Sequence, residues 1–101
     1  MRYYLISHDE DTRVGLRLAG IEGTVVSGRT EFTAELERVI SDEDVAVLLV
    51  TEECASYDAT RIQELKLSLH RPLVAVIPGS REKIAGHSIM QLIREAIGIK
   101  I

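Results

Sequence analysis

The chain has 101 residues, which fits a single domain with a core of its own. Hydrophobic residues make up 46% of the chain and charged residues 28%, a balance that excludes a disordered chain. The net charge of −4 excludes a protein whose overall charge draws it to nucleic acid or to an anionic membrane, and three tyrosines and one phenylalanine provide few platforms for stacking bases.

The first strand and the first helix are predicted at the start of the chain. Residues 3–6 form a short apolar strand, and a polar loop follows it. Asp11 or Thr12 is expected to cap the helix, because either side chain can accept a hydrogen bond from a free N–H group of the first turn. Val14 and Leu18 stand four residues apart, so the helix is predicted to turn this pair toward the core.

A second strand and helix follow Gly20, which can end the first helix in a left-handed conformation. Residues 21–26 are predicted to form a short strand. Thr30 is expected to cap a clearer helix, whose early turns are favoured by acidic side chains near the positive end of the helix dipole. The apolar face of this helix consists of Phe32, Leu36, Val39 and Ile40.

Two continuous apolar runs, at residues 45–50 and 73–77, predict two further strands. Runs without alternation suit parallel strands that are covered on both faces. A mostly helical stretch lies between them, and residues 56–58 are expected to interrupt it. The last helix is predicted over residues 84–97, with Gly98 as its stop. The apolar stripe of the middle helical stretch consists of Ile62, Leu65 and Leu69.

The alternation of strand and helix predicts an α/β fold, with a parallel sheet, right-handed crossovers and helices on both faces. We expect four strands in the order 2-1-3-4, a shortened relative of the flavodoxin-like and receiver-like arrangement. Residues 1–101 then form one domain, with a Rossmann-like core over about residues 1–78 and a C-terminal amphipathic helix over about residues 84–98.

The acidic loop SHDED, residues 7–11, follows the first strand, where a phospho-receiver domain holds magnesium with carboxylates. Asp9 and Asp11 would be the ligands of such a site. A receiver also needs an aspartate after its third strand, where this chain has Glu52 and Glu53, and a lysine after a fifth strand, which is not predicted. A solvated loop that caps the first helix is favoured. A stand-alone receiver-like signalling domain without a proper phosphoacceptor is the alternative.

His8 and Cys54 are the remaining candidates for chemistry near these loops. The histidines lie in separate segments without the spacing of a metal site, so His8 is expected to be an exposed loop residue. Cys54 stands near a helix start, but the residues that follow, ASYDAT, offer neither glycines nor an arginine to hold a phosphate. We expect Cys54 to be a small residue that packs in the core. A phosphotransfer protein that uses Cys54 or His8 is a third hypothesis.

The turn after the fourth predicted strand has some features of an anion site. Ser80, Arg81 and a helix N-terminus could together bind an anion. A single glycine makes no Walker-type cradle, however, and Pro78 removes a backbone donor. A Pro-Gly turn that leads into the last helix is therefore favoured. Because no catalytic set, cofactor loop or metal site is predicted, we expect a binding module and not an enzyme.

Cys54 is the only cysteine, which excludes an internal disulfide and fits a reducing compartment. The start of the sequence lacks the longer apolar segment of a signal peptide, and no stretch approaches the length of a membrane-spanning helix. A cytosolic protein is expected, docked on something larger.

The last predicted helix has an apolar arc of about 160°, which is broader than a stripe resting on one sheet requires. The whole arc could pack in the core of this chain. Alternatively, one border of the arc packs on the sheet while the other border contacts a partner helix. The arc consists of Ile89, Met90, Leu92, Ile93, Ala96 and Ile97.

Three segments in this order resemble the F subunit of the V-type and archaeal A-type ATPases. HDEDTRVGLRLAGI (8–21) is similar to that family's acidic loop and G-F-x-L-A-G-like helix, with Leu16 where the family often has phenylalanine. VAVLLVTEECA (45–55) resembles its apolar strand followed by T-E-E, and RPLVAVIPGSR (71–81) resembles its P-x-x-x-x-I-P-G stretch. The ending IREAIGIKI is also similar to the family's ending.

The resemblance implies a non-catalytic part of the rotor. The F subunit belongs to the central stalk, binds the coiled-coil D subunit and makes transient contact with the catalytic ring of A and B subunits, which hydrolyse ATP. It supports or regulates the coupling of ATP hydrolysis or synthesis to ion transport. The protein would be cytoplasmic and peripheral to the membrane through the complex, with no cofactor, no membrane insertion and no nucleic acid.

The family makes its contacts with the D subunit largely through the C-terminal helix. Carried over to this sequence, that helix spans residues 84–97, and Arg94 would add a charge at the rim of the contact. The apolar candidates are Ile84, Ile89, Met90, Leu92, Ile93 and Ile97.

Overall fold

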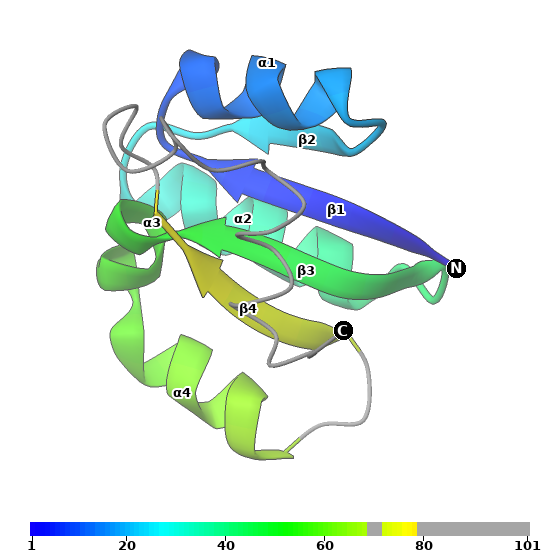
Figure 1. Ribbon diagram of the computed structural model, residues 1–101. Helices are drawn as coiled ribbons and strands as arrows, with labels where there is room; N and C mark the ends of the chain where they lie inside the picture. The colour runs from blue at the N-terminus through cyan, green and yellow to red at the C-terminus, as the bar shows by residue number, and fades with distance from the viewer. Residues whose placement is uncertain (69–71, 79–101) are drawn as a thin grey trace.

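The computed structural model describes residues 1–68 and 72–78, while residues 69–71 and 79–101 lie outside the described part (Figure 1). The predicted C-terminal helix therefore lies outside the described residues. The strands are β1 (Arg2–Ser7), β2 (Glu22–Val25), β3 (Val45–Thr51) and β4 (Leu73–Ile77). The helices are α1 (Glu10–Leu18), α2 (Arg29–Ile40), α3 (Glu52–Tyr57) and α4 (Ala59–Ser68).

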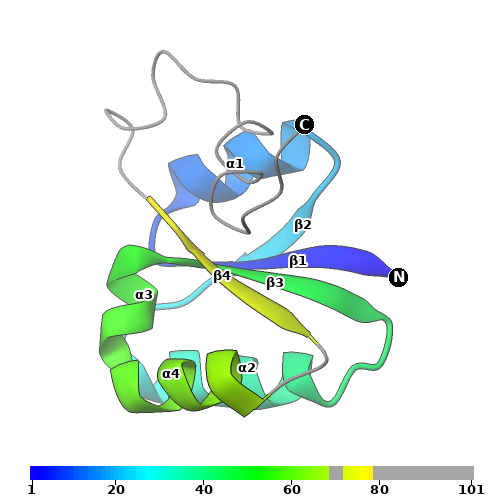
Figure 2. The ribbon, with the colours of Figure 1, turned by 60° about the horizontal axis from the view of Figure 1, so that its bottom comes forward.

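All strand pairs are parallel, and the sheet order is β2-β1-β3-β4, which confirms the predicted topology. The helices α2, α3 and α4 lie on one face of the sheet and α1 lies on the other (Figure 2). This is the two-sided cover that right-handed crossovers produce when the chain first moves to one side of β1 and then to the other.

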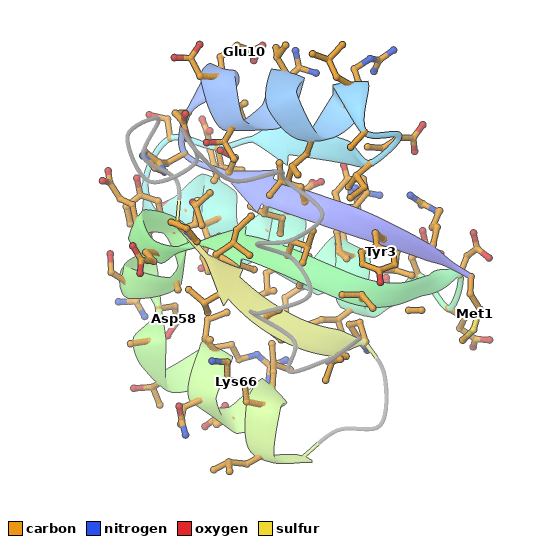
Figure 3. The ribbon with its side chains drawn as sticks, in the orientation of Figure 1. Met1, Tyr3, Glu10, Asp58 and Lys66 are labelled. Carbon is orange, nitrogen blue, oxygen red and sulfur yellow. The ribbon has the colours of Figure 1, made fainter. Side chains whose placement is uncertain are left out.

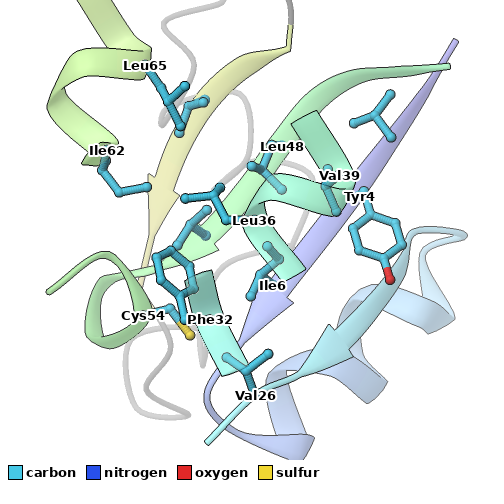
Figure 4. Packing of buried hydrophobic residues seen from close by; sticks show 13 residues of the cluster. Tyr4, Ile6, Val26, Phe32, Leu36, Val39, Leu48, Cys54, Ile62 and Leu65 are labelled. Carbon is cyan, nitrogen blue, oxygen red and sulfur yellow. The ribbon is translucent and has the colours of Figure 1, made fainter. Parts of the chain in front are cut away.

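The larger core lies between the sheet and the three helices of the first face. Phe32 and Leu36 of α2 pack against β1 and β3, and Ile62 and Leu65 extend the cluster under α4 (Figure 4). All four of these side chains are buried, as predicted. Leu69, the third residue of the stripe predicted for the middle helical stretch, lies outside the described residues. The strands contribute to this cluster Tyr4, Ile6, Val45, Leu48, Val50 and Val74.

A smaller core lies on the opposite face, under α1. Because neighbouring residues of a strand point to opposite faces, the strand positions that alternate with the first core fall here. The buried members of this cluster are Leu5, Leu16, Ile21, Leu49, Ala75 and Ile77.

The start and the buried face of α1 differ from the prediction. Asp9, and not Asp11 or Thr12, is the N-cap, and its side chain accepts a hydrogen bond from the Thr12 N–H group. Val14 and Leu18 point outward, and Leu18 is 86% exposed, so the predicted apolar pair was wrong. Thr12 and Leu16 are the buried residues of this helix.

The end of α1 follows the prediction more closely. Gly20 adopts a φ of 90°, and its N–H group donates to the Arg17 carbonyl at 2.9 Å. A left-handed glycine directly after the helix closes the last turn without the steric cost that a side chain adds. The second strand is shorter than the predicted residues 21–26. Ile21 and Val26 lie just outside β2, and both are buried.

The start of α2 also differs from the prediction. Gly28 is the N-cap, with a φ of 93° that favours glycine, so Thr30 does not cap this helix. The Glu31 carboxylate reaches back and accepts a hydrogen bond from the Ser27 N–H group at 2.7 Å. An acidic side chain of the first turn thus satisfies a backbone donor that precedes the helix.

The predicted interruption of the middle helical stretch is confirmed at Asp58, which lies between α3 and α4 (Figure 3). Its backbone has a φ of −151° and a ψ of 70°, outside the helical region. The Asp58 carboxylate accepts a hydrogen bond from the Arg61 N–H group at 3.3 Å, and its carbonyl accepts from the Ile62 N–H group at 3.1 Å. Asp58 therefore starts α4 after ending α3.

Candidate functional site at the carboxyl edge of the sheet

Ligands of doubly wound folds bind where the strands end at their carboxyl edge. The central strands β1 and β3 end at Ser7 and Thr51, and both side chains are completely buried. The helices that follow, α1 and α3, lie on opposite faces of the sheet (Figure 2). The side chains after these two strands are therefore the first place to look for chemistry.

The Asp9 carboxylate is directed into its own helix start. One of its oxygens, Oδ2, lies 3.0 Å from the Thr12 backbone nitrogen and 2.9 Å from the Thr12 hydroxyl. The Ser7 hydroxyl lies 2.7 Å from the Asp9 carbonyl oxygen and 3.1 Å from Asp9 Oδ1, and it accepts a bond from the Asp9 N–H group at 3.0 Å. These bonds fix the turn from β1 into α1 and satisfy buried hydroxyl groups.

His8 is half-buried and not the exposed loop residue that the sequence predicted. Its Nδ1 atom lies 3.1 Å from the Thr51 hydroxyl, so the imidazole bridges the ends of β1 and β3. Asp9 Oδ1 lies 3.6 Å from Nδ1, and Glu53 Oε1 lies 3.8 Å from Nε2. The imidazole thus joins the turn before α1 to the first turn of α3.

Cys54 is completely buried in the larger core beside Phe32 (Figure 4). Burial raises the pKa of its thiol above the ordinary value of 9.0 and outweighs the hydrogen bond with Thr51, which acts in the opposite direction. A thiol with a raised pKa and no exposure is a poor nucleophile. The prediction of a small packing residue is confirmed.

The geometry of this edge suits helix capping better than phosphoryl transfer. Both Asp9 oxygens already accept bonds from Ser7 or Thr12, and β3 is followed by Glu52 and Glu53 in place of an aspartate. Within residues 1–68 and 72–78, no group of three or more histidine, cysteine, aspartate or glutamate side chains is placed to hold a metal ion.

A second polar cluster, which the sequence analysis missed, joins α2 to the edge of the sheet. The Tyr4 hydroxyl is hydrogen-bonded to Thr24 of β2 and lies 3.1 Å from Glu35 Oε2, to which Thr24 also donates at 3.0 Å. Arg38 donates to both Glu35 oxygens, at 3.0 and 2.6 Å. The Arg38 hydrogen bond is the largest of the effects that lower the pKa of Glu35.

Two arginines enclose the Tyr4 ring of this cluster. The guanidinium carbons of Arg2 and Arg38 lie 5.4 and 5.5 Å from the ring centroid, within the range of cation–π contacts. The Glu35–Arg38 pair at i, i+3 spacing was readable from the sequence, but its contact with Tyr4 and Thr24 depends on the fold. The cluster ties α2 to β1 and β2.

The predicted partner-binding residues lie outside the described residues, together with Ser80 and Arg81 of the turn before them. Those predicted contacts are Ile84, Ile89, Met90, Leu92, Ile93, Arg94 and Ile97. In the part of the chain that the structure describes, no helix combines the length and the apolar character that crossing a bilayer requires.

Comparison with known proteins extends over nearly the whole chain. The sequence model of the family described as ATP synthase (F/14-kDa) subunit matches residues 5–95. The F subunit of the A-type ATP synthase of Thermococcus kodakarensis is 30% identical over 99 residues, which cover 92% of this chain and 91% of the relative. That of Thermococcus sibiricus is 34% identical over 101 residues, with 92% and 91% covered. The F subunit of the V-type ATP synthase of Thermus thermophilus is 30% identical over 97 residues, with 92% and 93% covered.

Proposed function

Because this chain belongs to the ATP synthase (F/14-kDa) subunit family, as an F subunit of the V/A type, we propose that it is a non-catalytic part of the central stalk of a prokaryotic rotary ATPase. In this role it binds the coiled-coil D subunit and supports or regulates the coupling of ATP hydrolysis or synthesis to ion transport. It makes transient contact with the A/B ring and stays in the cytoplasm, peripheral to the membrane through the complex.

One observation carries the proposal: the family match runs from residue 5 to residue 95 and takes in every helix that the structure describes. The chain also spans more than nine-tenths of the relatives it matches. The chemistry of the described carboxyl edge agrees, because Ser7, Asp9 and Thr51 bond to neighbouring side chains and backbone groups of this chain.

We assign the contact with the D subunit to the predicted C-terminal helix. Its apolar arc is broader than one packing surface requires, and apolar side chains flanked by an arginine suit an interface with a helical partner. The proposed contact residues are Ile84, Ile89, Met90, Leu92, Ile93, Arg94 and Ile97.

Co-expression with the cognate D subunit tests the proposal. We expect a stable one-to-one complex on size exclusion at micromolar concentration, and the absence of a complex would contradict the function. Ile97→Glu should weaken the complex, because it places a charge in the apolar contact. The matched control is Gln91→Glu, which introduces the same side chain on the polar side of the predicted helix. Equal affinities of the two folded variants would remove Ile97 from the contact.

The two alternative functions have inexpensive tests of their own. Incubation with a small phosphodonor and Mg²⁺ should give no stable aspartyl-phosphate, and a mass shift on Asp9 or Asp11 would favour the receiver-like domain. Complex formation with the D subunit should survive Cys54→Ser and His8→Ala, because neither residue belongs to the proposed contact. Loss of binding in a folded variant would reopen a role for these side chains.

A further inference from the structure

Helix α4 lies at one margin of the layer of three helices, on the side of β4, the outer strand of the described sheet (Figure 1). Its buried residues Ile62 and Leu65 turn toward the sheet. Arg61 donates to the Glu37 carboxylate of α2 at 3.0 and 3.2 Å, which fixes a second side of α4 toward its neighbour. At 100° per residue, the positions that remain point outward. The exposed ones among them are Ala59, Thr60, Gln63, Glu64, Lys66 and Leu67.

The outward positions of α4 form a groove. Ala59, Gln63 and Leu67 stand four residues apart in one row. Thr60 and Glu64 form the row beside it, and the two rows together line an open groove of about 450 Å³. Grooves between rows of i, i+4 side chains are the places where the ridge of a second helix packs. The groove therefore has the shape of a helix-binding surface.

The groove also lacks most of the charge that other exposed helix surfaces of this chain carry. Of the described residues that line it, only Glu64 is charged, and Leu67 is 77% exposed. The outer side of α2, by comparison, presents Arg29, Glu31 and Arg38. Depletion of charge around an exposed apolar side chain is typical of the centre of a protein contact. A partner is therefore expected to cover Leu67.

Charges at the two borders of the groove indicate what kind of partner fits. Glu64, which lies 3.6 Å from Arg61, stands on one border, and the exposed Lys66 stands on the other. In a twofold pair of two copies, each border meets the same border of the second copy, so that Glu64 approaches Glu64 and Lys66 approaches Lys66. A helix of a different protein can instead present a basic residue to Glu64 and an acidic residue to Lys66. The charges thus favour a different helical chain over a second copy.

Given the helical partner that the proposed function supplies, we propose that the α4 groove is a second contact surface for the coiled-coil D subunit. A ridge of one D helix lies between the two rows, and an apolar side chain of this ridge packs against Leu67 and over the small Ala59. The ten residues of α4 span about 15 Å, which is too short to bury the roughly 800 Å² per partner of a standard interface. The groove therefore adds to the proposed contact of the C-terminal helix and does not replace it.

Binding of the purified D subunit to the full-length chain tests the surface. Leu67→Glu places a charge against the apolar part of the ridge and should raise the Kd by at least about tenfold. Thr60→Glu should raise it several-fold, whereas the matched control Thr33→Glu, at an exposed threonine on the outer side of α2, should leave it unchanged. Equal Kd values of the wild type and a folded Leu67→Glu variant would overturn the proposal. Absence of binding by the wild type would contradict the proposed function and this surface with it, so the two failures are distinguishable.

A cysteine reporter measures the contact without a change of charge. In the complex with the D subunit, Gln63→Cys should react several-fold more slowly with a thiol reagent than in the free chain, and Thr33→Cys should react at one rate in both states. Mass spectrometry of the chain follows the reaction, and the native Cys54 is completely buried. Equal rates at residue 63 in the free and bound states would overturn the proposal. Protection of residue 63 in the free chain that disappears on dilution would also overturn it, because it would assign the groove to a second copy.

Discussion

Replacing Glu35 by glutamine removes the charge at the centre of the Tyr4 cluster while keeping the side-chain shape. The carboxylate, 16% exposed, accepts bonds from Arg38, Thr24 and Tyr4. Hydrogen bonds to a buried charge contribute about 1.5–3 kcal/mol, but exposed ion pairs contribute only about 0.2–1 kcal/mol. Because Arg38 is 53% exposed, we expect Glu35→Gln to lower the free energy of unfolding by about 1–2 kcal/mol.

The matched control is Glu37→Gln in the same helix. Glu37 also pairs with an arginine, Arg61, at 3.0 and 3.2 Å, but its side chain is half exposed. We expect it to cost less than about 0.5 kcal/mol. Urea unfolding at pH 7 measures both free energies. Equal costs for the two variants would refute the importance of burial at Glu35.

The effect of Glu35→Gln has a predicted pH dependence. The pKa of Glu35 is below its ordinary value of 4.5 in the folded protein, chiefly through the Arg38 hydrogen bond, so the unfolded chain binds the proton more readily. The stabilisation is complete above that ordinary value and is lost as the pH falls through the lower folded-state pKa. The difference between the wild type and Glu35→Gln should therefore narrow below about pH 4.5. A difference that is constant or grows on acidification would contradict this assignment.

Three further outcomes follow from the described residues. Gly23→Ala should lower the free energy of unfolding by at least about 1 kcal/mol, because a Cβ atom at this position would lie 2.8 Å from Leu5 Cβ and 2.9 Å from the Leu5 carbonyl oxygen. Thermal unfolding measures the effect, and an unchanged melting temperature would show that the strands move apart freely. Asp9→Ala should lower the free energy of unfolding by about 0.5–2 kcal/mol through loss of the α1 cap, whereas Thr30→Ala at the exposed start of α2 should leave it almost unchanged. Urea unfolding measures both variants, and a larger loss for Thr30→Ala than for Asp9→Ala would contradict the observed caps. Cys54 should react with a thiol reagent only after unfolding, because it is buried and its pKa is raised; rapid reaction of the native protein at pH 8 would contradict this.

The strand order could be predicted from the sequence because the apolar runs carry it. Residues 45–50 and 73–77 lack polar positions, which is typical of parallel strands in an α/β sheet, and the lengths between them allow helical crossovers. The caps could not be predicted in the same way. The run Asp9, Glu10, Asp11 offers several capping side chains in succession, and the choice depends on where β1 ends and on the buried Ser7 hydroxyl.

The buried face of α1 shows why spacing alone misled the prediction. Val14 and Leu18 stand four residues apart, but so do Thr12 and Leu16, and hydrophobicity favours the first pair. The second pair is buried because Asp9 Oδ2 accepts a hydrogen bond from the Thr12 hydroxyl, which removes the cost of placing that hydroxyl away from water. A polar residue two positions inside a helix start can thus fix the helix phase through its cap.

The position of His8 could have been inferred by combining the predicted strand order with the predicted first and third strands. With β1 beside β3 in the order 2-1-3-4, residues that follow the two strands are neighbours, and Ile6 lies opposite Val50 in the observed register. His8 and Thr51 then meet although they are far apart in sequence. The roles of these contacts also explain why the residue chemistry alone predicted only a binding module. In the loops where this fold places ligands, Asp9, His8 and Thr51 join and cap this chain's own elements, so the family identity came from similarity along the whole sequence and not from one site.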